Sequence, residues 1–459
     1  MNLTVWLLSL PAATAASPLT LDTVLASVDR HAPKLAALDA KVTEAEAKAL
    51  AARGAFDPTL KSKVRDYSGP YDRFQADTAL SMQSGFGPSV TAGYRIGAGA
   101  FPTYAGAYET LDLGEVRVEV ATPLLADLGM TAERAKRLVS DHHATAARSL
   151  RDDGRQQLYG KAATTYWKWV AAGEKLALSM ELLALAEARQ TGLEQQVAEG
   201  ALPPLEAIDN QRVVWSRRAD VATAEQVVTE SAVALSLFLR DDRMEPLVPD
   251  VSALPTGTPG PSSRPTNDTD LIPRALAARP DLVAFDALLD AATVDLQRAR
   301  STLLPDVDGM VGWSQDRSTI PDDKGTQPEV VVGMDLKVPL ALRKGRGELA
   351  RSRAAIDRLA AERRWLVDQI TAEVRALIQA RALALTRWEH ASAAVSHARE
   401  VAHLETRALE LGASDIFKVT KREETLAKER KAEIDARAEV ARIDALLQTA
   451  TASWSAPGV

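Results

Sequence analysis

Residues 116–125 read VRVEVATPLL, and Gly129 then separates them from a helical pattern that continues to about Glu199. Alternation of apolar and polar residues is typical of a strand, whereas apolar residues three and four apart are typical of a helix. The same plan recurs 216 positions later, where Pro339 corresponds to Pro123 and Gly345 to Gly129 without a gap. A constant offset across a change of secondary structure indicates an internal repeat.

A helix divided by a proline opens each copy. In the first copy Pro33 interrupts an amphipathic pattern that ends near Arg53, and Pro58 leads into extended chain. A shift of 247 positions lays Pro33 on Pro280 and Pro58 on Pro305. Because proline removes a backbone donor, it breaks or kinks a helix at the same place in both copies. We therefore predict that the whole unit is duplicated.

Short polar and apolar alternations separate the two helical parts of each copy. In the last of them, residues 330–338, one face is apolar and the other is largely small or charged, as a strand between lipid and water requires. A sheet half buried on a soluble core is the alternative explanation, but no other apolar layer is available to cover these strands. The offsets of 247 and 216 differ by 31 residues, which predicts a longer loop or an extra short hairpin in the first copy. The alternating segments are 59–66, 74–83, 89–96 and 116–120 in the first copy, and 307–314 and 330–338 in the second.

The helices after the strands are unusually long. The pattern from Thr131 to Glu199 covers 69 residues, or about 100 Å at 1.5 Å per residue. The helices predicted over 21–53 and 204–240 have 33 and 37 residues, so together they match its length. We therefore expect columns in which two short helices stack end to end beside one long helix.

Composition argues against several classes of function. The formal net charge is −7 and no basic patch is present, which argues against a nucleic acid partner. The chain has no Cys, so it has neither disulfides nor thiolate chemistry. The histidines lack the i, i+4 spacing of a helical metal site, and we find neither a phosphate-binding loop nor a nucleophile elbow. We assign no catalytic residue, no cofactor and no metal site.

The segments before and after the first repeat have distinctive compositions. Residues 1–16 (MNLTVWLLSLPAATAA) combine an apolar run with small residues at the end, as in a secretory signal. Residues 241–268 are rich in Pro, Ser and Thr and are interpreted as a linker between the copies. No later stretch approaches the ~20 apolar residues of a membrane helix.

These features together resemble the TolC-like outer membrane efflux proteins over essentially the whole chain after the signal. The resemblance is carried by the duplication, the Pro33 and Pro280 breaks, the strand exits at Pro123 and Pro339, and the turns predicted at Gly200 and Gly412. It implies a mainly α fold with β structure, in which long coiled-coil helices and β-hairpins form a tandem repeat. It also implies a homotrimer with four strands per chain, giving a 12-stranded outer-membrane barrel on an α-helical tunnel in the periplasm.

The resemblance implies a function as well. The protein is expected to be the passive outer-membrane channel of a tripartite efflux or type I secretion system. Its expected partners are outer-membrane lipid, a periplasmic adaptor of the membrane fusion type, and an inner-membrane transporter of the RND or ABC class. A periplasmic coiled-coil scaffold or adaptor without a pore is the alternative, although an adaptor would normally have one helical hairpin. The exported substrate is not indicated by the sequence.

The two helical turns are candidate docking positions for the adaptor. If they form the periplasmic tip, the residues at each turn are small enough for another helix end to approach. Glycine also ends helices with no such role, so this explanation stays open. The docking candidates are Gly200, Ala201 and Leu202 in the first copy, and Gly412, Ala413 and Ser414 in the second.

Four charged residues one helical turn beyond are candidates for a pore gate. Relatives often carry a ring of Asp there, but this chain has Glu206 and Asp209 in the first copy and Lys418 and Lys421 in the second. Each pair is three residues apart and shares a helix face. We predict that acidic and basic pairs face each other across neighbouring columns in the closed state. Solvated charges on the outside of a coil are the alternative.

The sequence thus predicts the following organisation. The first repeat spans 17–240, with a strand region at 57–123 and helices at 131–199 and 204–240. The second repeat spans 269–455, with a strand region at 305–339 and helices at 346–411 and 415–453.

Overall fold

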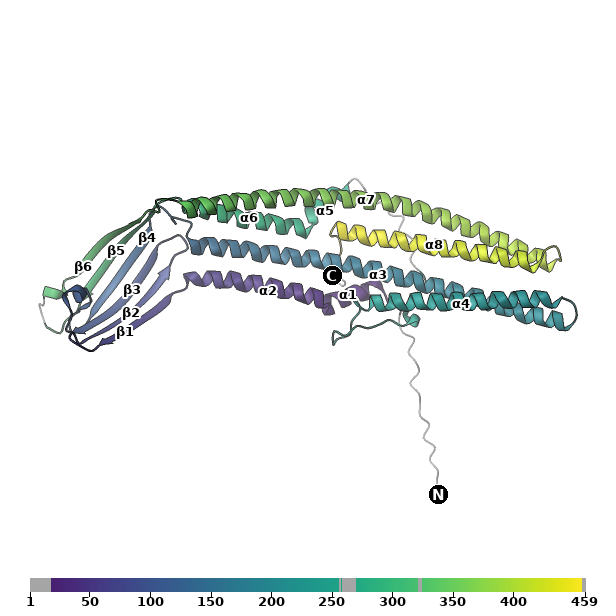
Figure 1. Ribbon diagram of the computed structural model, residues 1–459, viewed down its shortest axis with the longest axis horizontal. Coiled ribbons are helices and arrows are strands. Elements are labelled where there is room, and N and C mark those ends of the chain that lie inside the picture. Colours follow the sequence, from purple (N-terminus) through teal and green to yellow (C-terminus); the bar gives the residue numbers. More distant parts are fainter. Residues whose placement is uncertain (1–17, 256, 258–269, 321–323, 456–459) are drawn as a thin grey trace, which may run out of the picture. The chain divides into compact units, whose positions relative to one another are not determined.

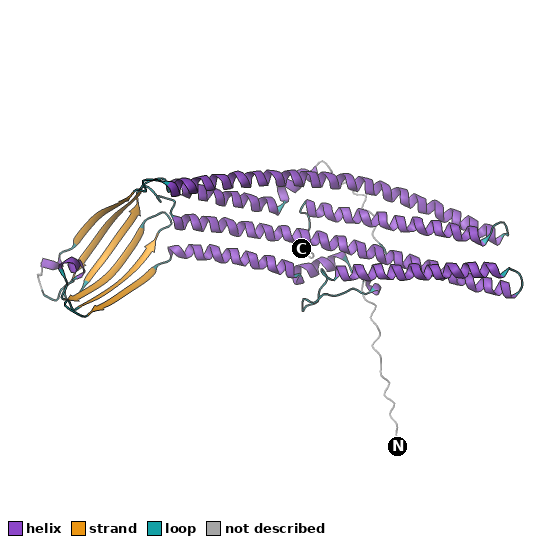
Figure 2. Ribbon diagram, in the orientation of Figure 1, coloured by secondary structure: helices purple, strands orange, loops and turns teal. Residues whose placement is uncertain are grey.

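The computed structural model describes residues 18–255, 257, 270–320 and 324–455. The predicted signal and part of the predicted linker lie outside these residues. The fold is mainly helical, with one antiparallel sheet of six strands (Figures 1 and 2). The helices are α1 (Leu21–His31), α2 (Pro33–Arg53), α3 (Ala132–Ala198), α4 (Pro204–Leu235), α5 (Leu271–Ala278), α6 (Pro280–Ser301), α7 (Arg343–Glu410) and α8 (Ile416–Ala450). The strands are β1 (Thr59–Tyr67), β2 (Arg73–Gln83), β3 (Ser89–Gly99), β4 (Glu115–Pro123), β5 (Asp306–Asp316) and β6 (Glu329–Lys337).

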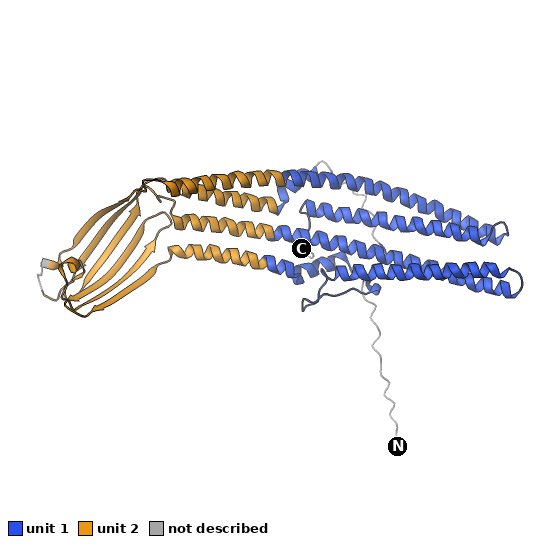
Figure 3. Cartoon of the chain, viewed as in Figure 1, with its two compact units in different colours: residues 1–38, 151–280, 367–459 blue, residues 39–150, 281–366 orange. Residues whose placement is uncertain are grey.

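The chain forms two compact units, shown in Figure 3. Unit 1 takes its residues from 1–38, 151–280 and 367–459, and is helical. Unit 2 comprises 39–150 and 281–366, and contains the sheet with the four helical segments that adjoin it. The tandem repeat of long helices and β-hairpins predicted from the sequence is confirmed.

Prolines divide the helices where the sequence predicts. Ala32 and Arg279 have extended backbones, with ψ of 115° and 121°, and Pro33 and Pro280 begin the next helices. The residue before a proline avoids helical ψ because the ring collides with its backbone. The Ala32 amide still donates to the Val28 carbonyl at 3.1 Å, so α1 ends without an abrupt loss of hydrogen bonding.

Alanines and ion pairs join the helices of unit 2. Ala146 of α3 is buried against Ala284 and Ala287 of α6, and such small side chains let two helices approach closely. Exposed pairs contribute only about 0–1 kcal/mol each, so the helices are held mainly by packing. The ion pairs are Arg148–Glu46 at 2.7 Å, Arg53–Asp141 at 2.8 Å and Arg363–Asp286 at 2.6 Å. Among the described residues, no helix combines the length and apolar character needed to cross a membrane.

The core of unit 1 lies where α1 and α4 pack on α3. Trp169 and Tyr159 of α3 are fully buried there, together with Val24, Val28 and Leu235. Full burial of side chains of this size contributes about 1.5–3 kcal/mol each. This cluster therefore anchors the middle of the long helix to the two shorter ones.

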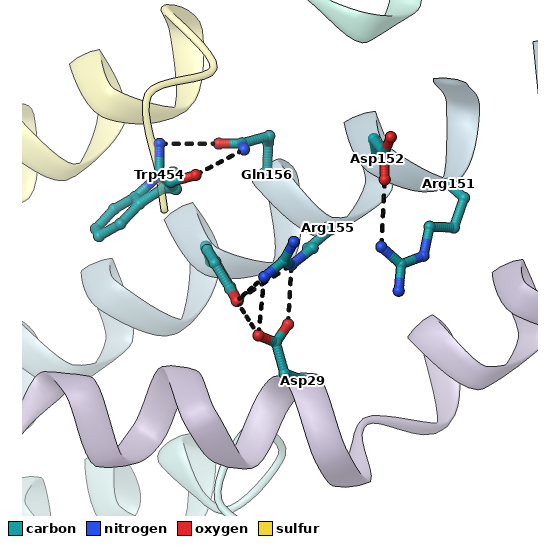
Figure 4. A network of polar contacts seen from close by, with 7 residues as sticks. Asp29, Arg151, Asp152, Arg155, Gln156 and Trp454 are labelled. Carbon is teal, nitrogen blue, oxygen red and sulfur yellow. Dashed lines mark hydrogen bonds and ion pairs between the residues drawn. The ribbon is translucent and has the colours of Figure 1, made fainter. Parts of the chain in front are cut away.

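A polar network lies at the edge of that core (Figure 4). Arg155 of α3 donates from Nε and Nη2 to the two carboxylate oxygens of Asp29 in α1, each at 2.9 Å. The Tyr159 hydroxyl also donates to Asp29, and the Arg155 guanidinium donates to that hydroxyl at 2.9 Å. Burial and the hydrogen bond to Asp29 raise the pKa of Tyr159 to about 12. Gln156 holds the backbone of Trp454 through bonds of 3.0 and 3.2 Å.

The sheet is a meander in which every strand pairs with its neighbours along the chain. The resemblance implied four strands per chain, and this number is wrong for the described chain. The reason is that β2 and β3 form an extra hairpin between β1 and β4. In the second repeat β5 and β6, which correspond to β1 and β4, pair directly. Of the two explanations for the 31 additional residues, the extra hairpin is the one observed.

The two faces of the sheet differ in chemistry along their whole width. Side chains of directly paired residues lie on the same face, so the register defines rows across the six strands. One row is apolar, namely Leu60, Leu80, Ala92, Val118, Trp313 and Val330. The next row is polar or small, namely Lys61, Ala79, Gly93, Arg117, Ser314 and Glu329.

Candidate functional site

The two helical turns have the same backbone geometry. Gly200 and Gly412 both have φ of +73°, a left-handed conformation that glycine adopts without strain. The Gly200 amide donates to Val197 at 3.0 Å and the Ala201 amide donates to Gln196 at 2.9 Å. Gly412 and Ala413 repeat both bonds, at 2.9 and 2.8 Å. This is the Schellman arrangement that satisfies the last carbonyls of a helix.

Space around the two glycines is open. A Cβ added at Gly200 or Gly412 would meet no atom within 4 Å. Large apolar side chains follow each turn at matching positions, with Leu205 70% exposed and Phe417 73% exposed. The turns therefore present an accessible backbone beside exposed apolar groups.

The helices that leave the two turns begin differently. Pro203 caps α4 without a side-chain hydrogen bond. At α8, Asp415 accepts the Lys418 backbone amide at 2.8 Å, which satisfies one of the free donors of a helix start. This bond and the side chain of Lys418 lower the pKa of Asp415.

The second turn is supported by a polar triad that the first lacks. Glu405 of α7 accepts a hydrogen bond from Ser414 and pairs with Arg422 of α8 at 3.3 Å. The Ser414 hydroxyl, followed by Arg422, lowers the pKa of Glu405. A shift of 212 positions places Leu193, Leu202 and Asn210 at the equivalent places of the first turn. There, buried Asn210 donates to the Ala186 carbonyl at 3.1 Å.

Three of the four charged gate candidates form ion pairs with residues three positions away in the sequence. Asp209 contacts Arg212 at 3.1 Å. Lys418 contacts Asp415 at 3.1 Å, and Lys421 contacts Glu424 at 3.3 Å. Glu206 lies in the first turn of α4 and is half buried. Within the described chain, no ion pair joins Glu206 or Asp209 to Lys418 or Lys421.

A charged network crosses the polar face of the sheet in unit 2. Arg117 of β4 reaches Asp77 of β2 at 2.7 Å. It crosses β3 at Gly93, where an added Cβ would lie 3.2 Å from the Arg117 Nε. Arg95 pairs with Glu115 at 2.5 Å on the same face. The polar face is therefore organised by specific pairs and by the absence of a side chain at Gly93.

An acidic cavity of about 450 Å³ in unit 2 is lined by residues of β2, β3, β4, β5 and β6 and by the start of α3. Arg298 neutralises one of its carboxylates, that of Asp127. Among the described residues, no group of three His, Cys, Asp or Glu is arranged to hold a metal ion. The carboxylates that line the cavity are Glu119, Asp127, Glu133, Asp306, Asp308 and Asp335.

Comparisons with known proteins agree with this geometry. The structure matches a membrane protein from Pseudomonas aeruginosa with a TM-score of 0.66, over 98% of this chain and 99% of that one, at 17% identity. It matches the outer membrane protein VceC of Vibrio cholerae with a TM-score of 0.65, over 94% and 95%, at 16% identity. The family model described as "Outer membrane efflux protein" matches residues 271–453. The second repeat therefore matches the outer membrane efflux protein family, and the whole chain shares the fold of these solved proteins.

Further comparisons support the placement of this protein in the bacterial outer membrane. The MtrE outer membrane channel of Neisseria gonorrhoeae, solved in an open state, matches with a TM-score of 0.64, over 94% of this chain and 88% of that one, at 14% identity. The pyoverdine export outer membrane protein OpmQ of Pseudomonas putida is 29% identical over 162 residues, which are 35% of this chain. That match spans 33% of the length of OpmQ.

Sequence reasoning missed the ion pairs between the two repeats. Four pairs join α3 to α8 in unit 1. The residue numbers of the partners in α8 decrease as those in α3 increase. This order would have been a signal, because antiparallel helices pair that way, but nothing local indicated that α3 and α8 are neighbours. The pairs are Glu174–Arg437, Lys175–Asp435, Glu181–Arg430 and Arg189–Glu423.

Proposed function

We propose that this protein is the outer-membrane conduit of an export assembly. Three copies enclose a water-filled path, with the sheets in the outer membrane and the helices in the periplasm. The channel is passive and has no catalytic role. An inner-membrane transporter supplies the energy, and a periplasmic adaptor connects the two.

The two-faced sheet is the observation that carries this proposal. An apolar row next to a polar row suits a wall with lipid on one side and water on the other. The apolar side chains are exposed in the single chain, including Leu60 at 70%, Val330 at 64% and Val332 at 76%. Exposed apolar patches of this extent mark contact with a membrane or a partner.

Conductance of the purified protein in planar lipid bilayers tests the channel. We expect heat-modifiable trimers in detergent and discrete conductance steps after insertion. The control is the same preparation after heating to the monomer, which should give no steps. A freely soluble monomer that never inserts into bilayers would support a periplasmic scaffold and contradict the proposal.

The docking role of the two turns is part of this proposal. Gly200, Ala201 and Leu202, with Gly412, Ala413 and Ser414, would contact the helical ends of the adaptor. The open space at both glycines and the exposed Leu205 and Phe417 support it.

Photo-crosslinking from the turns tests the docking role. A photoreactive amino acid at Ala201 or Ala413 is expected to form an adduct with a periplasmic adaptor in cells. The same amino acid at Leu185, which is exposed on α3 and lies more than three helical turns before the end of that helix, serves as the control and should give none. Equal adducts at all three positions would contradict docking at the turns.

The mixed-charge gate also stays part of the proposal. In the closed state Glu206 and Asp209 would face Lys418 and Lys421 across neighbouring columns of the trimer. Exposed ion pairs contribute about 0–1 kcal/mol each, but threefold symmetry repeats them. Changing both lysines to Glu is expected to raise single-channel conductance, while Lys428→Glu, further along α8, serves as the control. Unchanged conductance in the double variant would remove the gate from the proposal.

A further inference from the structure

Strands β1 and β6 form the two edges of the sheet, since each has a single neighbour among the described strands. Both contain nine residues and are exposed along almost their whole length. They run antiparallel, because all five strand pairs between them are antiparallel. Given the trimeric channel proposed above, on which this inference rests, we propose that β1 of one copy pairs with β6 of the next. Three copies of six strands then close a barrel of 18 strands.

The ends of the strands determine how far the copies are staggered. The paired residues lead across the sheet from Thr59 to Val331, through Ser81, Thr91, Glu119 and Gly312. Val331 lies six residues before the end of β6 at Lys337. If the neighbouring copy's Thr59 pairs with Lys337, then its Tyr67 pairs with Glu329 and both nine-residue strands overlap completely. An even stagger of six also keeps the apolar and polar faces continuous.

The tilt of the strands provides an independent check on this stagger. A strand rises about 3.3 Å per residue and neighbours lie about 4.8 Å apart. Over six strands, a stagger of four residues corresponds to a tilt of about 25°, six to about 35° and eight to about 42°. Closed barrels have tilts of about 35–45°, which leaves staggers of six and eight.

Charge distinguishes these two staggers. A stagger of six places Lys61 of β1 opposite Asp335 of β6, and Leu60 opposite Leu336. A stagger of eight places Lys63 opposite Asp335, but it also brings Lys61 opposite Lys337, a like-charge pair that the stagger of six avoids. Opposite charges across a strand pair stabilise it by roughly 0.2–1 kcal/mol, and like charges destabilise it. Charge complementarity therefore favours six.

The width of unit 2 also agrees with six strands per copy. Six strands at this tilt cover about 35 Å of circumference, whereas four would cover about 23 Å. The four helical segments of the same unit, at 8–10 Å per helix, cover about 32–40 Å. The β2–β3 hairpin thus makes the sheet as wide as the helices that continue from it. Since barrel diameter grows roughly with strand number, the pore wall is about 1.5 times as wide as with 12 strands.

Disulfide cross-linking in cell membranes tests the pairing directly, because the chain has no Cys of its own. The first variant carries Leu60→Cys and Leu336→Cys, which directly opposed residues can bridge at a Cα separation of about 4.5–5.5 Å. The control carries Ala92→Cys and Leu336→Cys. Ala92 shares a row with Leu60 but lies between β2 and β4 of its own copy. A third variant, Leu60→Cys with Val338→Cys, reports a stagger of eight.

We expect oxidation to convert the first variant almost entirely to covalent trimers, and to leave the other two more than tenfold less cross-linked. Cross-linking of the Ala92 variant instead would mean that β3 of one copy pairs with β6 of the next. Each copy would then contribute only four strands to the barrel, and the 18-strand proposal would be overturned. Cross-linking of the third variant alone would overturn the stagger of six. Heat-modifiable migration of the unoxidised protein separates these results from a failure of the channel itself, since a protein that is never trimeric contradicts the proposed function.

Discussion

At the scale of single residues, the glycines of α3 divide into those that permit a helix contact and those that do not. A Cβ at Gly160 would lie 2.1 Å from the Oγ1 and 3.1 Å from the Cβ of Thr449 in α8. A Cβ at Gly192, on the same helix, would meet nothing within 4 Å. The two positions therefore separate the cost of a lost close approach from the ordinary effect of glycine in a helix.

Replacing these glycines by alanine should change stability in opposite directions. Gly160→Ala is expected to destabilise unit 1 by about 1–3 kcal/mol, because α8 must move away from α3. Gly192→Ala is expected to stabilise by about 0.5–1 kcal/mol, because alanine favours the helix. Thermal unfolding followed by circular dichroism measures both. Equal shifts in the same direction would contradict the close contact at Thr449.

The buried tyrosines predict a late alkaline transition. The pKa values of Tyr159 and Tyr166 are raised to about 12, mainly by burial. Because the fold favours their protonated forms, this contribution to stability is complete below the unfolded pKa near 10 and is lost as pH rises through about 12. In a pH titration followed by tyrosinate absorbance, two tyrosines should ionise near pH 12. In the Tyr159→Phe variant, one tyrosine should ionise there. A late phase unchanged in that variant would disprove the assignment.

At the scale of elements, helix ends were predictable because their signals are local. The prediction of a long helix to about Glu199 meets an observed end at Ala198, followed by Gly200 with positive φ. The partners of Lys418 and Lys421 were not predictable in the same way. Both have acidic neighbours three residues away, and sequence alone does not decide between a local pair and one across helices.

The ion pairs between α3 and α8 should differ in strength according to their exposure. The side chains of Glu174 and Arg437 are 15% and 22% exposed, whereas those of Glu181 and Arg430 are 61% and 31% exposed. A double-mutant cycle to alanine is expected to give a coupling of about 0–1 kcal/mol for the exposed pair. The less exposed pair should couple more strongly, because breaking it leaves a poorly solvated charge. The reverse order, measured by chemical denaturation, would count against this explanation.

At the scale of the whole molecule, the duplication was visible in the sequence, but the width of the sheet was decided by its pairing. Six alternating segments could be read from residues 59–338, yet the resemblance implied four strands per chain. The segment containing β2 and β3 could have formed a loop region outside the wall. Only the pairing of β2 with β1 and of β3 with β4 shows that the hairpin widens the sheet.

Deleting that hairpin should narrow the barrel. Removal of residues 69–99 takes out 31 residues and lets β1 pair with β4, as β5 pairs with β6. We expect a trimer whose barrel is about one third smaller in diameter, because diameter follows strand number. Cryo-electron microscopy of the wild type and the variant measures this change. A folded trimeric variant with an unchanged barrel would show that the hairpin does not belong to the wall.

The paired glycine turns also bear on stoichiometry. Their backbones are equivalent, but one is supported by Glu405, Ser414 and Arg422, whereas the equivalent positions at the other are Leu193, Leu202 and Asn210. A threefold assembly would therefore display two interleaved sets of three contact points. An adaptor that contacts only the shared backbone would saturate at six molecules per trimer, whereas one that distinguishes the charged triad from the uncharged residues at the first turn would saturate at three.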